Sequence, residues 1–292
     1  MQPSTGIVRF LGAMLSLVLL IAAPAPARAA GTYPELLELF REWQAFERPA
    51  SRDGAPDYTA PTLARKQAAL RVHQSRLAAL DPTAWPQEQR IDYELVRAQM
   101  NGLDFDLRVL QPWARDPAYY QTVWTEMSDT PEHEGPAHHG LVELWTYSFP
   151  LSRADEQKLA RELQVVPPLL AQARGNLTGN ARDLWLTGIG TMQWQVESLD
   201  EFAGRTKSSG PELRRAIAAA RSATTEFVTW LQAQAPSKNG PSGVGKEAYD
   251  WNLRHVHLVP LTWDDEVMLL KRELSRAHAS LRFEEQRNRG LP

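Results

Sequence analysis

Apolar residues recur at intervals of three and four along most of the chain beyond residue 30, which is the pattern of one buried face on an amphipathic helix. Capping residues, Pro and Gly separate these stretches, and Ser152, Asn180 and Thr262 are the expected N-caps of their helices. The pattern predicts helices over residues 33–46, 61–80, 87–110, from Ser152 to the Pro167-Pro168 pair, from Asn180 through Leu199, from Pro211 through Leu231, over 246–257 and from Thr262 through Leu281. Val and Ile are sparse and no run alternates with period two, so the sequence predicts an all-α fold without a sheet.

Two of these helices carry specific expectations. The helix over 87–110 is expected to end before Pro112, which has no amide hydrogen to donate. Its expected buried stripe is Ile91, Leu95, Leu103, Leu107 and Leu110. The last helix has the most regular stripe, with strict 4-3-4-3-4 spacing through Trp263, Val267, Leu270, Leu274, Ala277 and Leu281. Loops are expected at 47–60, 111–140, 204–211 and 235–245, and the second of these is long and aromatic.

The first thirty residues have the pattern of a secretory signal peptide. Arg9 precedes an uncharged apolar stretch from Phe10 to Ala23, and Ala27-Arg28-Ala29 supplies a small-x-small cleavage site. The apolar stretch is shorter than the ~20 residues of a membrane-spanning helix, although an uncut N-terminal anchor is the alternative. We therefore expect a signal peptide over 1–30 and a single helical domain over 31–292, exported to the periplasm or the extracellular space, with no membrane association after cleavage.

Composition and charge exclude several classes of protein. The 292 residues are 43% hydrophobic and 23% charged, which excludes a disordered or collagen-like chain. Without residues 1–30 the chain keeps 30 basic and 35 acidic residues, so no basic surplus favours nucleic acid or a polybasic membrane contact. The absence of Cys excludes disulfides, thiolate chemistry and Cys-bound metal.

The densest cluster of chemically active side chains is the loop from Pro131 to Gly140. It holds His133, Glu134, His138 and His139. A helical zinc site needs two His four residues apart, whereas these His pairs are separated by five and six residues with Gly135-Pro136 between them. A loop could still bind a metal through His133 and His138 or His139, with Glu134 as ligand or base; the alternative is an exposed polar loop.

Aromatic side chains flank the same loop. Trp113, Trp124 and Trp145 are the candidates for a substrate groove, whereas Trp185, Trp230 and Trp263 fall in helical stripes and are expected in the core. The sequence thus predicts a substrate or loop site around these His, Glu and Trp residues, and it assigns no catalytic residue and no metal ligand.

A second motif resembles a phosphate-binding loop. Residues 240–246 satisfy G-x-x-x-x-G-K, but Glu247 stands where Ser or Thr would hold magnesium, and the segment follows a helix and not a strand. The pattern favours a Gly-rich linker in which Gly245 begins a helix. His255 and His257 lie two apart at a helix end and are interpreted as structural.

Several stretches resemble a bacterial family of exported proteins, the domain of unknown function 885. They are Gly240-Pro-Ser-Gly-Val-Gly-Lys-Glu-Ala-Tyr249, His257-Leu-Val-Pro-Leu-Thr-Trp-Asp-Asp265, Arg272-Glu-Leu-Ser-Arg-Ala277, residues 281–292, residues 131–140 and Gln172-Ala-Arg-Gly-Asn-Leu-Thr-Gly-Asn180. Members of this family are about twice this long and mostly helical. Many are considered zinc metallopeptidases of the helical gluzincin kind, with a His-Glu-containing zinc motif in the C-terminal half.

The resemblance implies a multi-helix array like the N-terminal half of a helical peptidase cradle, so the domain over 31–292 is expected to be incomplete at its C-terminus. No zinc ligand or catalytic carboxylate of the family has a counterpart in this chain, so zinc is expected only with the C-terminal half. The expected role is a non-catalytic wall of a peptide-binding cleft, with a peptide substrate, no nucleic acid, and the C-terminal half as partner. The alternatives are a self-standing helical scaffold or small-ligand-binding protein, and a self-contained metal loop.

Overall fold

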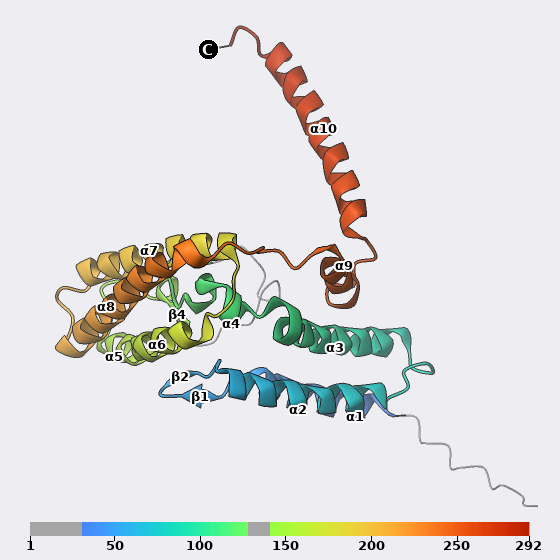
Figure 1. Ribbon diagram of the computed structural model, residues 1–292, viewed down its shortest axis with the longest axis horizontal. Helices are drawn as coiled ribbons and strands as arrows, with labels where there is room; N and C mark the ends of the chain where they lie inside the picture. Colours follow the sequence, from blue (N-terminus) through green and yellow to red (C-terminus); the bar gives the residue numbers. More distant parts are fainter. Residues whose placement is uncertain (1–30, 128–140, 292) are drawn as a thin grey trace, which may run out of the picture. The chain divides into compact units, whose positions relative to one another are not determined.

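The computed structural model describes residues 31–127 and 141–291 and confirms the all-α class (Figure 1). The longer helices are α1 Tyr33–Glu47, α2 Ala60–Ala78, α3 Gln87–Phe105, α5 Arg153–Glu162, α6 Val166–Asn176, α7 Arg182–Arg205, α8 Pro211–Gln234, α9 Lys246–His255 and α10 Trp263–Arg287. Short elements connect them: the π-helix Asp106–Leu110, α4 Pro112–Arg115, and 3-10 turns at Pro117–Tyr120, Leu144–Thr146, Leu163–Val165 and Ala235–Ser237. Two pairs of two-residue strands complete the described residues, β1 Ser51–Arg52 with β2 Ala55–Pro56, and β3 Val123–Trp124 with β4 Val142–Glu143.

Helices α1, α2 and α3 enclose the smaller of two apolar cores. Leu36, Leu39, Trp43, Leu70, Leu77, Tyr93, Val96, Met100 and Leu107 are buried in it. The predicted stripe of α3 is wrong in its first half, because Ile91 and Leu95 are 50% and 49% exposed. Tyr93, Val96 and Met100 repeat with similar helical spacing on another face, and that face packs into the core shared with α1 and α2.

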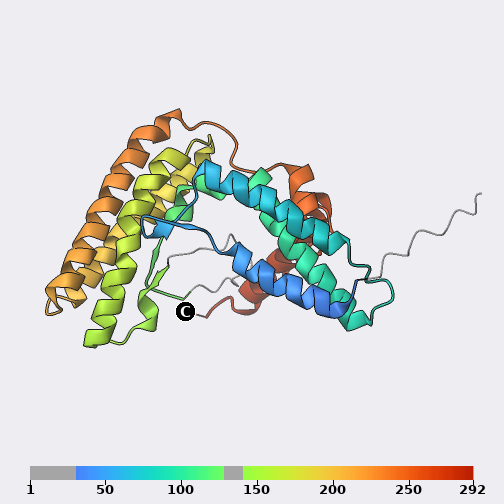
Figure 2. The ribbon, with the colours of Figure 1, turned by 90° about the horizontal axis from the view of Figure 1, so that it is seen from below.

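Helices α5 to α8 enclose the larger core, and α7 packs lengthwise on α8 (Figures 1 and 2). Trp185, Phe202 and Phe227 are fully or almost fully buried there. The Pro167-Pro168 pair does not end a helix as expected. It lies in the first turn of α6, where a missing amide hydrogen costs no helical hydrogen bond, and a 3-10 turn separates α6 from α5.

Residues 111–127, predicted to be loop, are largely ordered and partly buried. Tyr119, Tyr120 and Val123 belong to the larger core. The side chain of Gln195, fully buried on α7, fixes this segment: its Oε1 accepts hydrogen bonds from the backbone amides of Thr122 and Val123 at 2.7 and 3.0 Å. The described part of this connection, residues 111–127, is therefore part of the core scaffold and not only a surface loop.

Two side chains join the two cores. Leu63 on α2 and Trp113 on α4 each pack against both. Between the cores, α3 widens into the π-helix and then stops at Gln111, whose φ of 44° is left-handed. Pro112 starts α4 directly afterwards, as its missing amide predicts.

The C-terminal helices confirm the predicted starts. Gly245 is the N-cap of α9, and Thr262 caps α10 in a capping box with Asp265. Asn101 on α3 donates to the backbone carbonyl of His255 at 3.0 Å, which fixes the end of α9. Among the helices in residues 31–127 and 141–291, none combines the length and the apolar composition needed to cross a bilayer.

Candidate functional site

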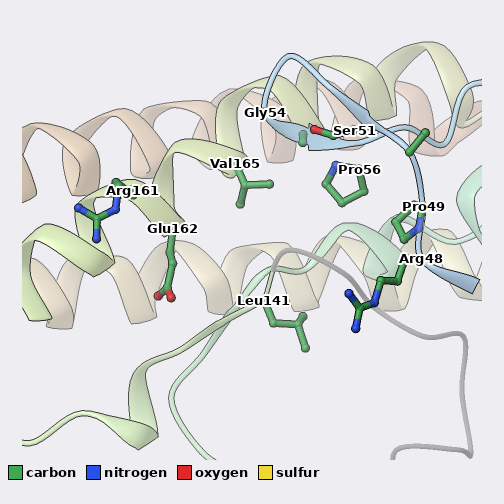
Figure 3. A pocket seen from close by; sticks show the side chains of 11 residues that line it. Arg48, Pro49, Ser51, Gly54, Pro56, Leu141, Arg161, Glu162 and Val165 are labelled. Carbon is green, nitrogen blue, oxygen red and sulfur yellow. The ribbon is translucent and has the colours of Figure 1, made fainter. Parts of the chain in front are cut away.

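A pocket of about 360 Å³ lies between the β1–β2 hairpin and the end of α5 (Figure 3). It is lined by Arg48, Pro49, Ala50, Ser51, Gly54, Ala55, Pro56, Leu141, Arg161, Glu162 and Val165. Its volume is at the lower end of the range of small-molecule sites. Three distant parts of the sequence therefore build it: the connection after α1, the residue that begins the segment before β4, and the end of α5.

The hairpin that forms one side of the pocket is set by its turn. Asp53 and Gly54 both have positive φ, 54° and 82°, as the two central residues of a type I′ turn require. Gly supplies the second of these conformations without steric cost. The sequence reading placed 47–60 in a loop and missed this hairpin, although Asp-Gly is among the strongest local hairpin signals.

Hydrogen bonds fix the hairpin onto α6. The amide of Gln172 donates to the carbonyl of Pro56 at 3.1 Å and accepts from the amide of Tyr58 at 2.7 Å, so it pairs the strand backbone as a neighbouring strand would. At the other end, Lys66 donates to the last carbonyl of α1, Glu47 O, at 2.6 Å. Burial lowers the pKa of this lysine. Hydrogen bonds to α6 and from Lys66 therefore fix this wall of the pocket in place.

The pocket combines an apolar floor with charged side chains at its mouth. Ala55, Pro56 and Val165 are buried, whereas Arg48 and Arg161 are exposed. In Figure 3 these two arginines lie at opposite ends of the pocket lining. Neither forms an ion pair with an acidic side chain in the described parts of the chain, so two guanidinium groups lie at the rim of the pocket without a neutralising carboxylate.

Glu162 is the one carboxylate of the pocket lining, and it is already engaged. It accepts a hydrogen bond from the hydroxyl of Tyr147 at 3.0 Å and lies 3.7 Å from Lys158. Lys158 also lies over the Tyr147 ring, 5.1 Å from its centroid. Because Glu162 already has these two partners, the pocket mouth favours an anion over a cation.

A second polar cluster lies behind the floor of the pocket. The hydroxyl of Tyr120 donates to the carbonyl of Trp113 at 2.7 Å and accepts from Asn176 at 3.0 Å, and Asn176 also donates to Gln172 at 3.2 Å. Burial raises the pKa of Tyr120 above its ordinary range. A continuous set of hydrogen bonds therefore runs from the hairpin anchor at Gln172 to the tryptophan that joins the two cores.

Asp106, at the start of the π-helix, is the most perturbed acid described. Burial raises its pKa from 3.8 to about 7. Burial is also the main cause of the raised pKa of Tyr119, to which the charge of Asp106 adds a smaller contribution. π-Helical turns often occur at functional sites. A carboxyl group with this pKa is partly protonated at neutral pH, and it can exchange a proton there.

The tryptophans predicted to line a groove lie in different surroundings. Trp113 packs in the junction of the two cores, Trp124 is half-buried on β3, and Trp145 is 42% exposed just after β4. The indole N–H of Trp124 is buried and has no hydrogen-bond partner in the described residues. The structure thus leaves Trp145 as the accessible member of the three, while the core expectation is confirmed for Trp185 and wrong for Trp263, which is 38% exposed.

The predicted loop residues His133, Glu134, His138 and His139 lie outside the described residues. Within residues 31–127 and 141–291, no three His, Asp or Glu side chains come close enough to hold a metal ion. The described donor set therefore does not fit a zinc centre, and no step of a zinc reaction can be assigned to these residues.

The glycine-rich segment 240–246 serves as a structural clamp. The hydroxyl of Ser242 accepts from the backbone amide of Asp183 at 2.8 Å, at the start of α7, and Arg115 donates to the carbonyl of Ser242 at 2.9 Å. Asn180 is not the helix cap that its position suggested; Ala181 is. Its side chain instead accepts from the amides of Asn239 and Gly240 at 2.7 and 2.9 Å.

Sequence reasoning missed Arg48 and Arg161, the residues that give the pocket its charge. Neither belongs to a motif, and only the fold brings them to one site.

Comparison with known proteins agrees with the fold. No curated protein matches the chain. Among solved structures, the chain is similar to one from Shewanella oneidensis described as a "putative lipoprotein of unknown function", with a TM-score of 0.57 and 15% identity over 90% of this chain. The match covers 50% of that protein, so this chain spans about half its length. Residues 43–287 match the family described as bacterial protein of unknown function, DUF885, and the chain belongs to that family.

Proposed function

We propose that this chain forms one wall of a peptide-binding cleft in an exported, peptidase-like protein, and that the pocket beside the β1–β2 hairpin binds the acidic end of the peptide. The observation that carries the proposal is the pair of arginines, Arg48 and Arg161, at the mouth of an apolar pocket without an acidic partner in the described residues. Guanidinium groups bind carboxylates in a planar, two-pronged geometry.

A peptide suits this pocket better than a bare anion. The floor of Ala55, Pro56 and Val165 offers apolar contact to a side chain, and the exposed strand Ser51–Arg52 offers a backbone edge. A carboxylate attached to an apolar residue would use both features at once. The resemblance to peptidase-like proteins noted from the sequence supports the same substrate class. Zinc and the reacting groups would belong to the half of the family's chain not included here.

A binding titration tests this proposal. The probe is fluorescein-labelled Ala-Ala-Leu with a free carboxylate, compared with the same peptide amidated at its C-terminus. We expect the free acid to bind roughly tenfold or more tightly, and Arg161→Gln to remove most of that difference because it removes one guanidinium. The matched control is Arg153→Gln, an exposed arginine that also lies on α5 but does not line the pocket.

Two results would contradict the proposal. Equal binding of the acid and the amide would show that the arginines do not recognise a carboxylate. Displacement of the peptide by free leucine at equal concentration would favour the alternative function, a small-ligand-binding protein.

A further inference from the structure

The last helix carries an apolar seam that no other element of residues 31–127 and 141–291 covers. Leu270, Leu274 and Leu281 are 67%, 57% and 56% exposed, and no residue of α10 is buried. These leucines belong to the 4-3-4-3-4 stripe, which is the a and d spacing of helices that pack side by side in a left-handed pair. A stripe of this kind is not needed for a helix that is exposed on all sides.

The start of α10, by contrast, is held firmly. The carboxylate of Asp250 on α9 accepts from the amide of Trp263 at 2.7 Å, and the hydroxyl of Tyr249 donates to Glu266 at 2.6 Å. Lys246 pairs with Asp264 at 2.6 Å. These contacts orient the first turn of α10 on α9 (Figure 1), and the seam lies beyond them. The exposure of the seam therefore does not result from loose attachment of α10 to the rest of the protein.

The comparisons supply a candidate for the element that covers the seam. The family match extends to residue 287, the last residue of α10, so the helix is part of the family's shared chain. The structural match covers 90% of this chain but only 50% of the Shewanella oneidensis protein. Half of that protein's polypeptide therefore has no counterpart in these 292 residues.

We propose that the seam of α10 is the docking surface for a helix from the half of the family's chain that this sequence does not include. The occupant is an amphipathic helix with its own apolar a and d positions, packed lengthwise against Leu270, Leu274 and Leu281. Lys271 and Glu273 flank the seam and would face oppositely charged residues on the partner helix. This surface is independent of the arginine pocket.

The test uses the full chain and, as probe, the unmatched half of the Shewanella oneidensis protein expressed as a separate, fluorescently labelled polypeptide. Leu274→Glu is the seam variant. We expect the unmodified chain to bind the probe and Leu274→Glu to weaken binding at least about 30-fold, since a charge at the centre of an apolar interface disrupts it. Hydrogen exchange of residues 263–287 should slow when the probe binds.

Met268→Glu is the matched control, because Met268 is equally exposed, at 63%, but lies about 140° around the helix from the seam. It should change the affinity less than threefold. Both variants alter exposed positions, so an unchanged melting temperature confirms that each is folded. Arg161→Gln should leave probe binding unchanged, which separates this test from that of the pocket.

Three outcomes would overturn the proposal. They are no binding by the unmodified chain, equal loss of binding in the Leu274→Glu and Met268→Glu variants, and sedimentation of the chain alone as a dimer that Leu274→Glu dissociates. The last would show that a second copy covers the seam.

Discussion

Replacing Asp106 by Asn should make the protein more stable at pH 8 and change its stability little at pH 4. Asn has the shape of the protonated acid and never carries a charge. Burial raises the pKa of Asp106 from 3.8 to about 7, so the folded protein holds a proton that the unfolded chain has released between these values. Below pH 4 both states are protonated and the residue costs nothing.

The magnitude follows from the two pKa values. Each pKa unit is worth about 1.4 kcal/mol, so the difference between 3.8 and about 7 corresponds to about 4 kcal/mol. This is stability that the native protein loses as the pH rises from about 4 through 7, and above pH 7 the full loss remains. The stability of Asp106→Asn relative to the native protein should therefore grow over the same range and then level off.

Urea unfolding followed by tryptophan fluorescence measures this difference at several pH values between 4 and 8. All other titrating groups are shared, so their effects cancel in the comparison. Asp200→Asn is the control, because a hydrogen bond from Arg221 lowers the pKa of Asp200, so its ionised form stabilises the fold. Asp200 is ionised in both states above its ordinary pKa of 3.8, so this substitution should destabilise the protein by a nearly constant amount between pH 4 and 8. The free energies of unfolding of Asp106→Asn and of the native protein are compared at each pH. If their difference changes by less than about 1 kcal/mol from pH 4 to 8, the reasoning is refuted.

Three further substitutions test the packing that holds the site. Gly188→Ala on α7 should lower the free energy of unfolding by about 1–3 kcal/mol, because the new Cβ would lie 2.7 Å from Pro117 Cβ and 2.9 Å from the amide nitrogen of Ala118. Gly190→Ala on the same helix places its Cβ with nothing within 4 Å and should raise the free energy of unfolding by up to about 1 kcal/mol. Thermal unfolding of the two variants measures both effects. Gln195→Leu should cost about 2–4 kcal/mol, since it leaves two buried amides of residues 122 and 123 without an acceptor, and hydrogen exchange there should accelerate. Ser242→Ala should cost about 1 kcal/mol in chemical denaturation by removing the cap of α7; an unchanged midpoint would contradict the capping role.

The sequence predicts best what is decided within one turn of chain. Pro211 begins α8, Ser152 caps α5 and Thr262 caps α10 as expected, because each depends on groups two to four residues away. Asn180 shows where such reasoning stops. Its side chain is of the right kind for a cap, but its partners are the amides of residues 239 and 240, and Ser242 takes the capping role from the same distant segment. No residue within one turn of Asn180 indicates that Ser242 would cap α7 in its place.

Hydrophobic periodicity predicts that a helix has a buried face but does not decide which of two faces it is. On α3 the stripes through Ile91 and through Tyr93 have the same spacing, and tertiary packing selects the second. On α10 the periodicity is confirmed as a helix, but Leu270, Leu274 and Leu281 of its apolar face stay more than half exposed. The pattern indicates that a surface is built for burial, and the covering element has to be found from the rest of the family.

The candidate site shows the same limit for chemistry. A search for functional residues along a sequence finds groups that are close in the chain, and the His-rich segment 131–140 is such a group. The pocket instead takes Arg48 from the end of α1 and Arg161 from α5, more than a hundred residues later, and its floor from a hairpin between them. Their shared feature is the absence of an acidic partner in the described structure, and only three-dimensional contacts establish that feature. In this all-α chain, the binding surface is therefore best sought among unneutralised charges at the ends of helices, where the fold brings distant segments together.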